Sequence, residues 1–311
     1  MEMPMELILD TDPGVDDAMA YFYAHACGAL NLVGVTTVFG NVTVSDATRN
    51  ALWLVQSSAG SARVHQGAAR PLQIPPNAPS SQVHGPRGFG TIEIEDPQGH
   101  AGTEDAADYL VRAARKAPGE LTLCAVGPLT NVARAIEQDP DFVSNLHQLV
   151  IMGGALDVAG NVTPFAEANF WNDPHAANMV VNAPGTGRVV IVGLDVTGAV
   201  ELTRDDFADV ERASPLAGGF LRRIGAFYID FYESRSGRPA CSLHDPSAVI
   251  ACHKPDLFKM EETALSVTVE GEKIGNMQRA NRSGGRLCHV CVGVDVDAVI
   301  SEYMTTVSLN P

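Results

Sequence analysis

Short apolar runs alternate with amphipathic stretches along most of the 311 residues. The apolar runs have the composition of buried strands. After most of them, apolar residues recur at the spacing of a helix. The runs cover residues 7–9, 32–38, 121–126, 149–152 and 188–192. Buried strands separated by helices predict an α/β fold, with a doubly wound and mostly parallel central sheet that has helices on both faces.

The remaining pattern predicts further elements and two irregular segments. Helices are expected to begin at Asp16, at 127–131 and at Asp173, and to cover residues 50–55, 215–232, 247–252 and 295–304. Residues 234–239 are expected to break the helix at 215–232, and 264–294 alternate as β-strands do. Little periodicity is present in 71–102 or 157–172. Because neither a linker nor a repeat is evident, we expect residues 1–311 to form a single domain.

Polar residues follow four of the predicted strands at the point where each strand ends. They form clusters at residues 10–17, 39–41, 127–131 and 152–154. The carboxyl ends of parallel strands lie on one edge of a sheet, and ligands bind beyond that edge. The sequence therefore predicts one polar site assembled from segments that are far apart in the chain.

The first cluster places four carboxylates, Asp10, Asp12, Asp16 and Asp17, within eight residues at a strand-to-helix turn. The helix dipole favours negative charge in a first turn, which accounts for Asp16 and Asp17 as solvated residues. It does not account for Asp10 and Asp12 at the end of a buried strand. Charges this close need protons or a hard divalent cation such as Ca²⁺ or Mg²⁺. We therefore favour a metal site over a solvated acidic turn.

Three later segments carry candidate side chains, and each also has a purely structural interpretation. His84 lies within 71–102, which is either a lid over the site or a surface excursion. Amides and a carboxylate lie between aromatic residues in 157–172, which suits hydroxyl recognition but also an Asn-rich turn. His244 and Asp245 begin a helix, where Asp245 is equally suited to be an N-cap.

Composition narrows the expected partners and location. The chain has 21 basic and 37 acidic residues, and a net charge of −16 argues against binding to nucleic acid. We find no run of about 18 uncharged apolar residues, so we expect no membrane span. The first six residues lack the basic start of a signal peptide. We therefore expect a cytoplasmic protein.

The six cysteines are scattered, and most lie in apolar runs, as buried free thiols do. Cys288 and Cys291 form a single C-x-x-C, whereas a zinc site would need a second pair. We expect neither bound zinc nor a disulfide.

Together these segments resemble the sequence blocks of the inosine/uridine-preferring nucleoside hydrolase family, in the family's order and approximate spacing. The blocks are Asp-Thr-Asp-Pro-Gly-Val-Asp-Asp at 10–17 and the segments 38–42, 127–131, 152–154, 161–169 and 244–246. Members cleave the N-glycosidic bond of ribonucleosides to ribose and free base, with a tightly held Ca²⁺. The resemblance implies this activity, a small-molecule ribonucleoside as substrate, and a homodimer or homotetramer.

The resemblance also implies a role for each matching residue. Ca²⁺ would be bound by Asp12, Asp17, Asp245 and the backbone carbonyl of Thr130, and it would hold the attacking water and two ribose hydroxyls. Asp12 would be the general base, and His244 would protonate the departing base. The ribose would be bound by Asp16, Asn41, Met152, Asn161, Glu167 and Asn169. Asp10 would orient its neighbours.

The base-binding side of the site is less defined by the resemblance. Tyr228 and Tyr232 match tyrosines that some members place around the leaving base, and His84 is expected to contact substrate as well. Ala168 stands where many relatives carry an aromatic residue, and Trp171 or Phe170 would have to compensate. Preference for purine, pyrimidine or both stays open.

Two other functions remain as alternatives. A phosphatase of the haloacid dehalogenase type would also carry Asp10-x-Asp12 after a strand, but it needs a later lysine and an acidic pair that do not stand out here. A calcium-binding protein that senses nucleosides without turnover would be expected to lack Asp12 or His244, and both are present.

Overall fold

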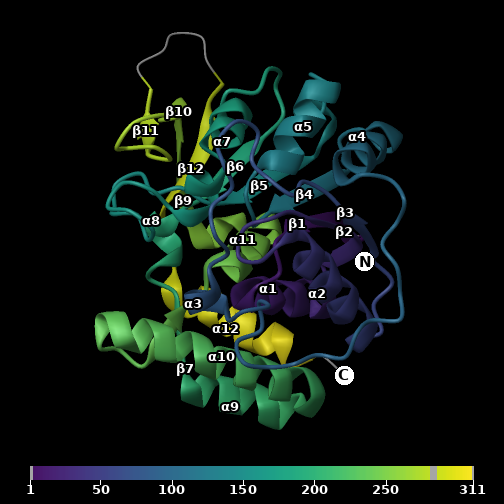
Figure 1. The fold of residues 1–311 in the computed structure, drawn as a ribbon, viewed down its shortest axis with the longest axis vertical. Helices are drawn as coiled ribbons and strands as arrows, with labels where there is room; N and C mark the ends of the chain where they lie inside the picture. Colours follow the sequence, from purple (N-terminus) through teal and green to yellow (C-terminus); the bar gives the residue numbers. More distant parts are fainter. Residues whose placement is uncertain (1–2, 281–285, 310–311) are drawn as a thin grey trace.

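A computed structural model describes residues 3–280 and 286–309, which are built around one eight-stranded sheet (Figure 1). In order across the sheet the strands are β3 (Arg63–Gln66), β2 (Leu30–Thr37), β1 (Met5–Thr11), β4 (Leu121–Ala125), β5 (Gln148–Met152), β6 (Val189–Val192), β12 (Cys288–Val294) and β9 (Phe258–Thr263). All neighbours are parallel except β9, which runs antiparallel to β12 at one edge. The prediction of a mostly parallel α/β sheet is confirmed.

Two small antiparallel ladders and the helices complete the described chain. The ladders are β7 (Glu201–Thr203) with β8 (Ala240–Ser242), and β10 (Leu265–Val267) with β11 (Met277–Arg279). The α-helices are α1 (Val15–Ala26), α2 (Val44–Ser57), α3 (Ser81–His84), α4 (Ala106–Lys116), α5 (Thr130–Gln138), α6 (Ala168–Asn172), α7 (Pro174–Val181), α8 (Leu194–Thr197), α9 (Arg204–Ala213), α10 (Pro215–Ser236), α11 (His244–His253) and α12 (Val296–Val307). Short 3₁₀ turns occupy Val143–Asn145 and Pro255–Leu257.

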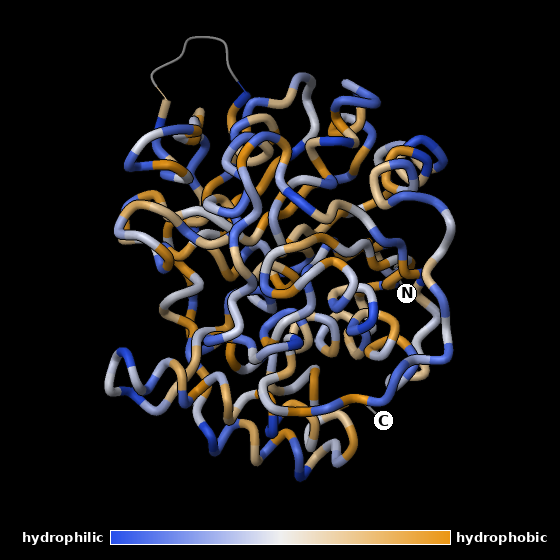
Figure 2. Tube along the Cα trace, in the orientation of Figure 1, coloured by the Kyte–Doolittle hydropathy of each residue, from blue (hydrophilic) through white to orange (hydrophobic). Residues whose placement is uncertain are grey.

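The core lies on both faces of the sheet because side chains alternate along each strand. On β1, Leu7 and Leu9 belong to the hydrophobic cluster formed with α1, α10, α11 and α12. Ile8, between them, belongs to the opposite cluster, formed with α4, α5 and α7. Figure 2 shows the outer helices α9 and α10 alternating between hydrophilic and hydrophobic positions, as expected for helices with one face on this core.

The order of the strands places a switch point between β1 and β4. From β1 the chain moves outward through β2 and β3 to one edge, then returns and moves outward through β4, β5 and β6 on the other side. In sheets of this kind the two loops that leave such a switch point diverge and open a crevice at the carboxyl ends of the strands. The loops leaving β1 and β4 are the predicted polar clusters at 10–17 and 127–131.

The structure differs from the helix predictions in detail. The helix expected at 215–232 does end within 234–239, but it first continues to Ser236, and its C-cap is Gly237, whose φ is +73°. The hydroxyls of Ser234 and Ser236 donate to carbonyls within the helix, so these serines are compatible with its last turn. Short helices also occur in both segments predicted to be irregular, α3 within 71–102 and α6 within 157–172.

Two further findings concern membrane-spanning helices and the cysteines. No helix in residues 3–280 and 286–309 combines the length and hydropathy needed to cross a membrane. All six cysteines are free and buried.

Candidate active site

The turn between β1 and α1 holds the four aspartates inside the protein. Asp10, Asp12 and Asp17 are at most 1% exposed, and Asp16 is 5% exposed. Gly14 N–H donates to Oδ2 of Asp17 at 2.9 Å, which caps the first turn of α1. The helix start therefore explains part of this cluster, but the carboxylates are buried and not solvated.

A fifth acid, Asp245, reaches the same place from the first turn of α11. Asp16, Asp17 and Asp245 each offer a carboxylate oxygen, and these oxygens lie within 4.8 Å of one another, the one such group found among the described residues. Burial, reinforced by the neighbouring aspartates, raises the pKa of Asp245 well above its usual range. The chain thus brings together acids more than 200 residues apart.

Asp12 lies beside this group with one oxygen held and the other unpartnered. Its Oδ2 accepts a hydrogen bond from Asn41 N–H at 2.5 Å. Its Oδ1 is buried without a hydrogen-bond partner among the described residues, and a Cβ at Gly127 would lie 2.7 Å from it. Burial and the charge of Asp17 raise the pKa of Asp12 well above its usual range.

The carboxylates of Asp16, Asp17 and Asp245, called the acid group below, suit a hard divalent cation. Its donors are all oxygen atoms, and Oδ1 of Asp16, like that of Asp12, is buried without a partner among the described residues. Buried carboxylate oxygens in this state are costly unless they are protonated or bound by a cation. The buried aspartate cluster could therefore bind a metal ion.

Asp10 and Thr130, from the first and third polar clusters, connect the segments around the site by hydrogen bonds. Oδ1 of Asp10 accepts from Thr36 Oγ1 at 2.5 Å and from Asn131 Nδ2 at 2.8 Å. Thr130 is fully buried at the start of α5, and its Oγ1 donates to Asp173 Oδ2 at 2.7 Å. These bonds tie the ends of β1 and β2 to the start of α5, and the start of α5 to the N-cap of α7.

The predicted ribose-binding residues line one pocket of about 300 Å³ above the aspartates. Asn41 donates through Nδ2 to Asp17 Oδ2 at 3.0 Å. Glu167 caps α6 by accepting from the Asn169 and Phe170 N–H groups, and it also accepts from Gly154 N–H at 2.9 Å. The pocket lining includes Asp16, Asn41, Met152, Asn161, Glu167, Asn169 and Asp245.

Loops from β4 and β5 are tied to this pocket by amide side chains. Asn169 Nδ2 donates to the carbonyls of Val126 and Met152 at 2.8 and 3.1 Å. Asn161 Oδ1 accepts from Ala168 N–H at 3.0 Å, which closes the irregular loop before α6. Ala168 lines the pocket, so the position lacking an aromatic ring does face the cavity.

Two histidines and two tyrosines line the other wall of the pocket. Val15 N–H donates to Nδ1 of His84 at 3.1 Å, so this nitrogen is an unprotonated acceptor. Burial lowers the pKa of His84 to about 4, and its 3.7 Å approach to Asp16 is therefore not an ion pair at neutral pH. Tyr228 Oη donates to Asp16 Oδ2 at 3.1 Å, and Tyr232 Oη lies 2.8 Å from Nε2 of His244.

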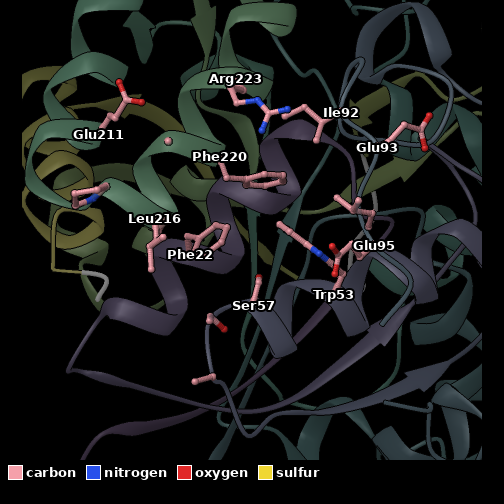
Figure 3. Close-up of a pocket in the computed structure, with 16 residues that line it drawn as sticks. Phe22, Trp53, Ser57, Ile92, Glu93, Glu95, Glu211, Leu216, Phe220 and Arg223 are labelled. Atoms are coloured by element: carbon pink, nitrogen blue, oxygen red, sulfur yellow. The ribbon is translucent and has the colours of Figure 1, made fainter. Parts of the chain in front are cut away.

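A larger cavity, about 810 Å³, lies elsewhere, between α1, α2, α10 and residues 92–95 (Figure 3). Phe22, Trp53 and Phe220 line it, and the ring of Phe220 contacts the other two. The lining also includes charged residues such as Glu93, Glu95 and Arg223. The smaller pocket instead gathers acids, amides and histidines at the switch point of the sheet. We therefore take the smaller pocket as the candidate active site.

Several lining residues were not predicted as site residues. Val83, Val126, Phe231 and Arg235 line the pocket, with the Arg235 guanidinium 5.0 Å from the centre of the Phe231 ring. The aromatic spacing along α10 was visible in the sequence, but it indicates a core face as readily as a site. Arg235 fell within 234–239, where the helix was expected to have ended already, whereas it belongs to the last turn of α10.

Comparison with known proteins agrees with this geometry. The family model described as "Inosine-uridine preferring nucleoside hydrolase" matches residues 7–301. Uridine nucleosidase 1 of Arabidopsis thaliana is 35% identical, over 98% of this chain and 94% of the relative. The non-specific ribonucleoside hydrolase RihC of Salmonella paratyphi B is 36% identical, over 88% and 86%.

Solved structures give the same result. The plant nucleoside hydrolase PpNRh1 has a TM-score of 0.94 and 33% identity, covering 98% of this chain and 99% of its own. The purine-preferring ribonucleoside hydrolase from Gardnerella vaginalis has a TM-score of 0.93 and 33% identity, covering 97% and 98%. The chain is an enzyme that belongs to the inosine-uridine preferring nucleoside hydrolase family.

Proposed function

We propose that this enzyme hydrolyses ribonucleosides with a Ca²⁺ ion bound by Asp12, Asp17, Asp245 and the backbone carbonyl of Thr130. The observation that carries the proposal is the buried aspartate group at the base of a pocket lined by amides and histidines. Bound there, the cation would offset the carboxylate charge and make a water molecule more acidic. Asp16 is assigned to the ribose although its carboxylate also lies within the acid group, because it lines the pocket beside Tyr228, which donates to its Oδ2.

The carboxylates suit the charge that develops during the reaction. Glycoside cleavage passes through an oxocarbenium-like state that is positive at the anomeric carbon. Preorganised negative groups stabilise such charge most strongly where water is excluded. Asp12 takes the proton of the attacking water, since its Oδ1 is buried without a partner among the described residues and is free to accept it.

Ribose recognition is assigned to Asp16, Asn41, Met152, Asn161, Glu167 and Asn169, which line the pocket. Carboxylates and amides are suited to bind vicinal hydroxyls. A site built in this way rejects deoxyribose, because the missing hydroxyl leaves buried polar groups without a partner.

The departing base is assigned to the wall formed by His84, Tyr228, Tyr232 and His244. Burial lowers the pKa of His244 to about 4, so its imidazole is neutral before substrate binds. Tyr232 contacts its Nε2 at 2.8 Å, and in our proposal this edge of the ring faces the base. The ring takes up a proton from solvent in the substrate complex, gives its Nε2 proton to the departing base and returns to the neutral form. Tyr228 and His84 shape the same wall through their ring contact at 5.5 Å.

We further propose one hydrolase domain over residues 1–311, acting as a homodimer or homotetramer on a small-molecule substrate without nucleic-acid partners. The match of the family model to residues 7–301 supports the single domain. The six free, buried thiols support a cytoplasmic location, where cysteines stay reduced.

A substrate panel tests the proposal. The purified enzyme with Ca²⁺ is assayed on inosine, adenosine, guanosine, uridine and cytidine, with 2′-deoxyinosine as the matched control. Release of free base from ribonucleosides, with the deoxynucleoside slower by at least about 100-fold, is the expected result. Hydrolysis of phosphate esters alone would indicate a phosphatase, and nucleoside binding without turnover would indicate a sensor. The panel also determines base preference.

A further inference from the structure

Thr197 is not among the residues that line the pocket, but it hydrogen-bonds to one that does, His244. It ends α8, the short helix that follows β6, and its side chain is fully buried. Thr197 Oγ1 is 2.8 Å from Nδ1 of His244, while Tyr232 Oη is 2.8 Å from Nε2 of the same ring. Both nitrogens of the imidazole are therefore held by hydroxyl groups from different elements.

The backbone around Thr197 is fastened to the segment that carries His244. Leu243 N–H donates to the Val200 carbonyl at 2.8 Å, and β7 pairs with β8 directly beside it. The segment that follows β6 is thus hydrogen-bonded along residues 240–243, just before His244. Within this segment, Thr197 is the residue whose side chain contacts the imidazole.

The direction of the threonine hydroxyl favours a functional interpretation. A threonine in a helix commonly donates to the carbonyl four residues earlier, which here belongs to Gly193. That carbonyl accepts from the backbone N–H of Thr197 at 3.1 Å, and Thr197 Oγ1 contacts His244. The partner of one ring nitrogen sets the tautomer and orientation in which the other nitrogen is presented.

We propose that Thr197 is a positioning residue, which holds Nδ1 of His244 so that Nε2 is presented beside Tyr232 at the base-binding wall. This inference rests on the proposed role of His244 at the leaving base. Without the Thr197 hydroxyl, Nδ1 loses its partner in a buried site, and the ring is free to rotate or to exchange its tautomer.

The test compares Thr197→Val, which keeps the shape but removes the hydroxyl, with Thr197→Ser, which keeps the hydroxyl. For inosine and uridine, Thr197→Val is expected to lower kcat by about 10- to 100-fold with a small change in KM. For 4-nitrophenyl riboside, whose leaving group needs no proton, the loss should be much smaller. Thr197→Ser should restore most of the activity. Equal losses on both kinds of substrate, or no rescue by serine, would overturn the proposal.

Thr122→Val provides the matched control, because Thr122 is fully buried in β4 with a hydroxyl that has no partner among the described residues. It should leave kcat unchanged. Nitrogen-15 NMR of the histidine rings gives a readout independent of turnover: Thr197→Val should change the tautomer signature of His244, and Thr122→Val should not. An unchanged His244 signature refutes the positioning role even in an active enzyme. Conversely, a wild-type protein that releases no base refutes the proposed function.

Discussion

At the scale of single residues, two carboxylates of the site, Asp12 and Asp16, each have one oxygen held by a hydrogen bond and one buried without a partner among the described residues. Asp12 illustrates this, since Asn41 N–H fixes Oδ2 while Oδ1 lies unpartnered over Gly127. A larger residue at 127 would occupy the space in front of that oxygen. A base that is oriented in this way can act without rearranging, and this is where much of its catalytic effect originates.

Asp12→Asn should remove this base while keeping the shape of the side chain. We expect kcat to fall by about 10²- to 10⁴-fold, the usual contribution of a general base, with further loss if metal affinity falls as well. Steady-state assays at saturating Ca²⁺ measure the effect. Asp139→Asn is the control. Asp139 is a mostly buried carboxylate that forms an ion pair with Arg115, and it lies at the C-terminal end of α5, whereas Thr130 of the site lies at the N-terminal end. Near-normal turnover in Asp12→Asn would contradict the assignment.

His244→Ala should affect substrates according to their leaving groups. Removal of the proposed proton donor is expected to slow inosine and uridine by about 100-fold or more, and 4-nitrophenyl riboside far less. The ratio of kcat/KM for the two kinds of substrate is the quantity to compare. His147→Ala, at an exposed position beside the start of β5, should leave that ratio unchanged. An equal loss on both substrates would argue that His244 only supports the fold.

At the scale of elements, turns place the site residues, and their backbone requirements are strict. Gly85 follows α3 with φ at +81°, and a Cβ there would lie 2.0 Å from the Gly90 carbonyl oxygen. Gly90 N–H in turn donates to the His84 carbonyl at 2.8 Å. This compact loop delivers His84 to Val15 at the start of α1, so its geometry is part of the pocket wall.

Gly85→Ala therefore combines backbone strain with a direct clash and should displace His84. We expect KM for ribonucleosides to rise by about 10-fold, with a stability loss of about 1–3 kcal/mol from the positive φ alone. Gly119→Ala is the matched control, because Gly119 has the same φ of +81° but open space around its Cβ position. Both variants should lose stability in thermal melts, and only Gly85→Ala should lose affinity. A similar KM in the two variants would exclude the loop from substrate binding.

The elements also show what a sequence can and cannot predict. Long apolar runs such as that of β4 were predicted because a buried parallel strand needs little else. The edge strand β3, with the sequence Arg-Val-His-Gln, has too few apolar residues to be recognised. Polar clusters at strand ends located the pocket. The contact between Thr197 and His244 joins residues that are 47 positions apart in the sequence through a buried hydroxyl. No spacing pattern in a sequence predicts such a pair.

At the scale of the whole molecule, the acid cluster links metal binding, protonation and stability. Burial raises the pKa of both Asp10 and Asp16 to about 6. In the unfolded chain these groups titrate near 4, so the folded protein without a cation binds protons more tightly. That contribution to stability is fully present below about pH 4 and is lost as pH rises through about 6. A cation bound by Asp12, Asp17 and Asp245 would have the opposite effect, because it requires these carboxylates to be deprotonated.

Thermal melts across pH should therefore show opposite trends with and without Ca²⁺. At pH 7.5, Ca²⁺ at about 100 times its Kd should stabilise the fold by about 2.7 kcal/mol and raise Tm by several degrees. As pH falls from 7.5 to 5, this increment should shrink, because burial raises the pKa of Asp12, Asp17 and Asp245 and protons therefore compete with the ion for their oxygens. EGTA at pH 7.5 should remove both the increment and the activity. Asp245→Asn should abolish the Ca²⁺ increment, whereas Asp139→Asn should retain it. An increment that is absent at pH 7.5, or equal at pH 5 and 7.5, would mean that the aspartate cluster does not bind the ion.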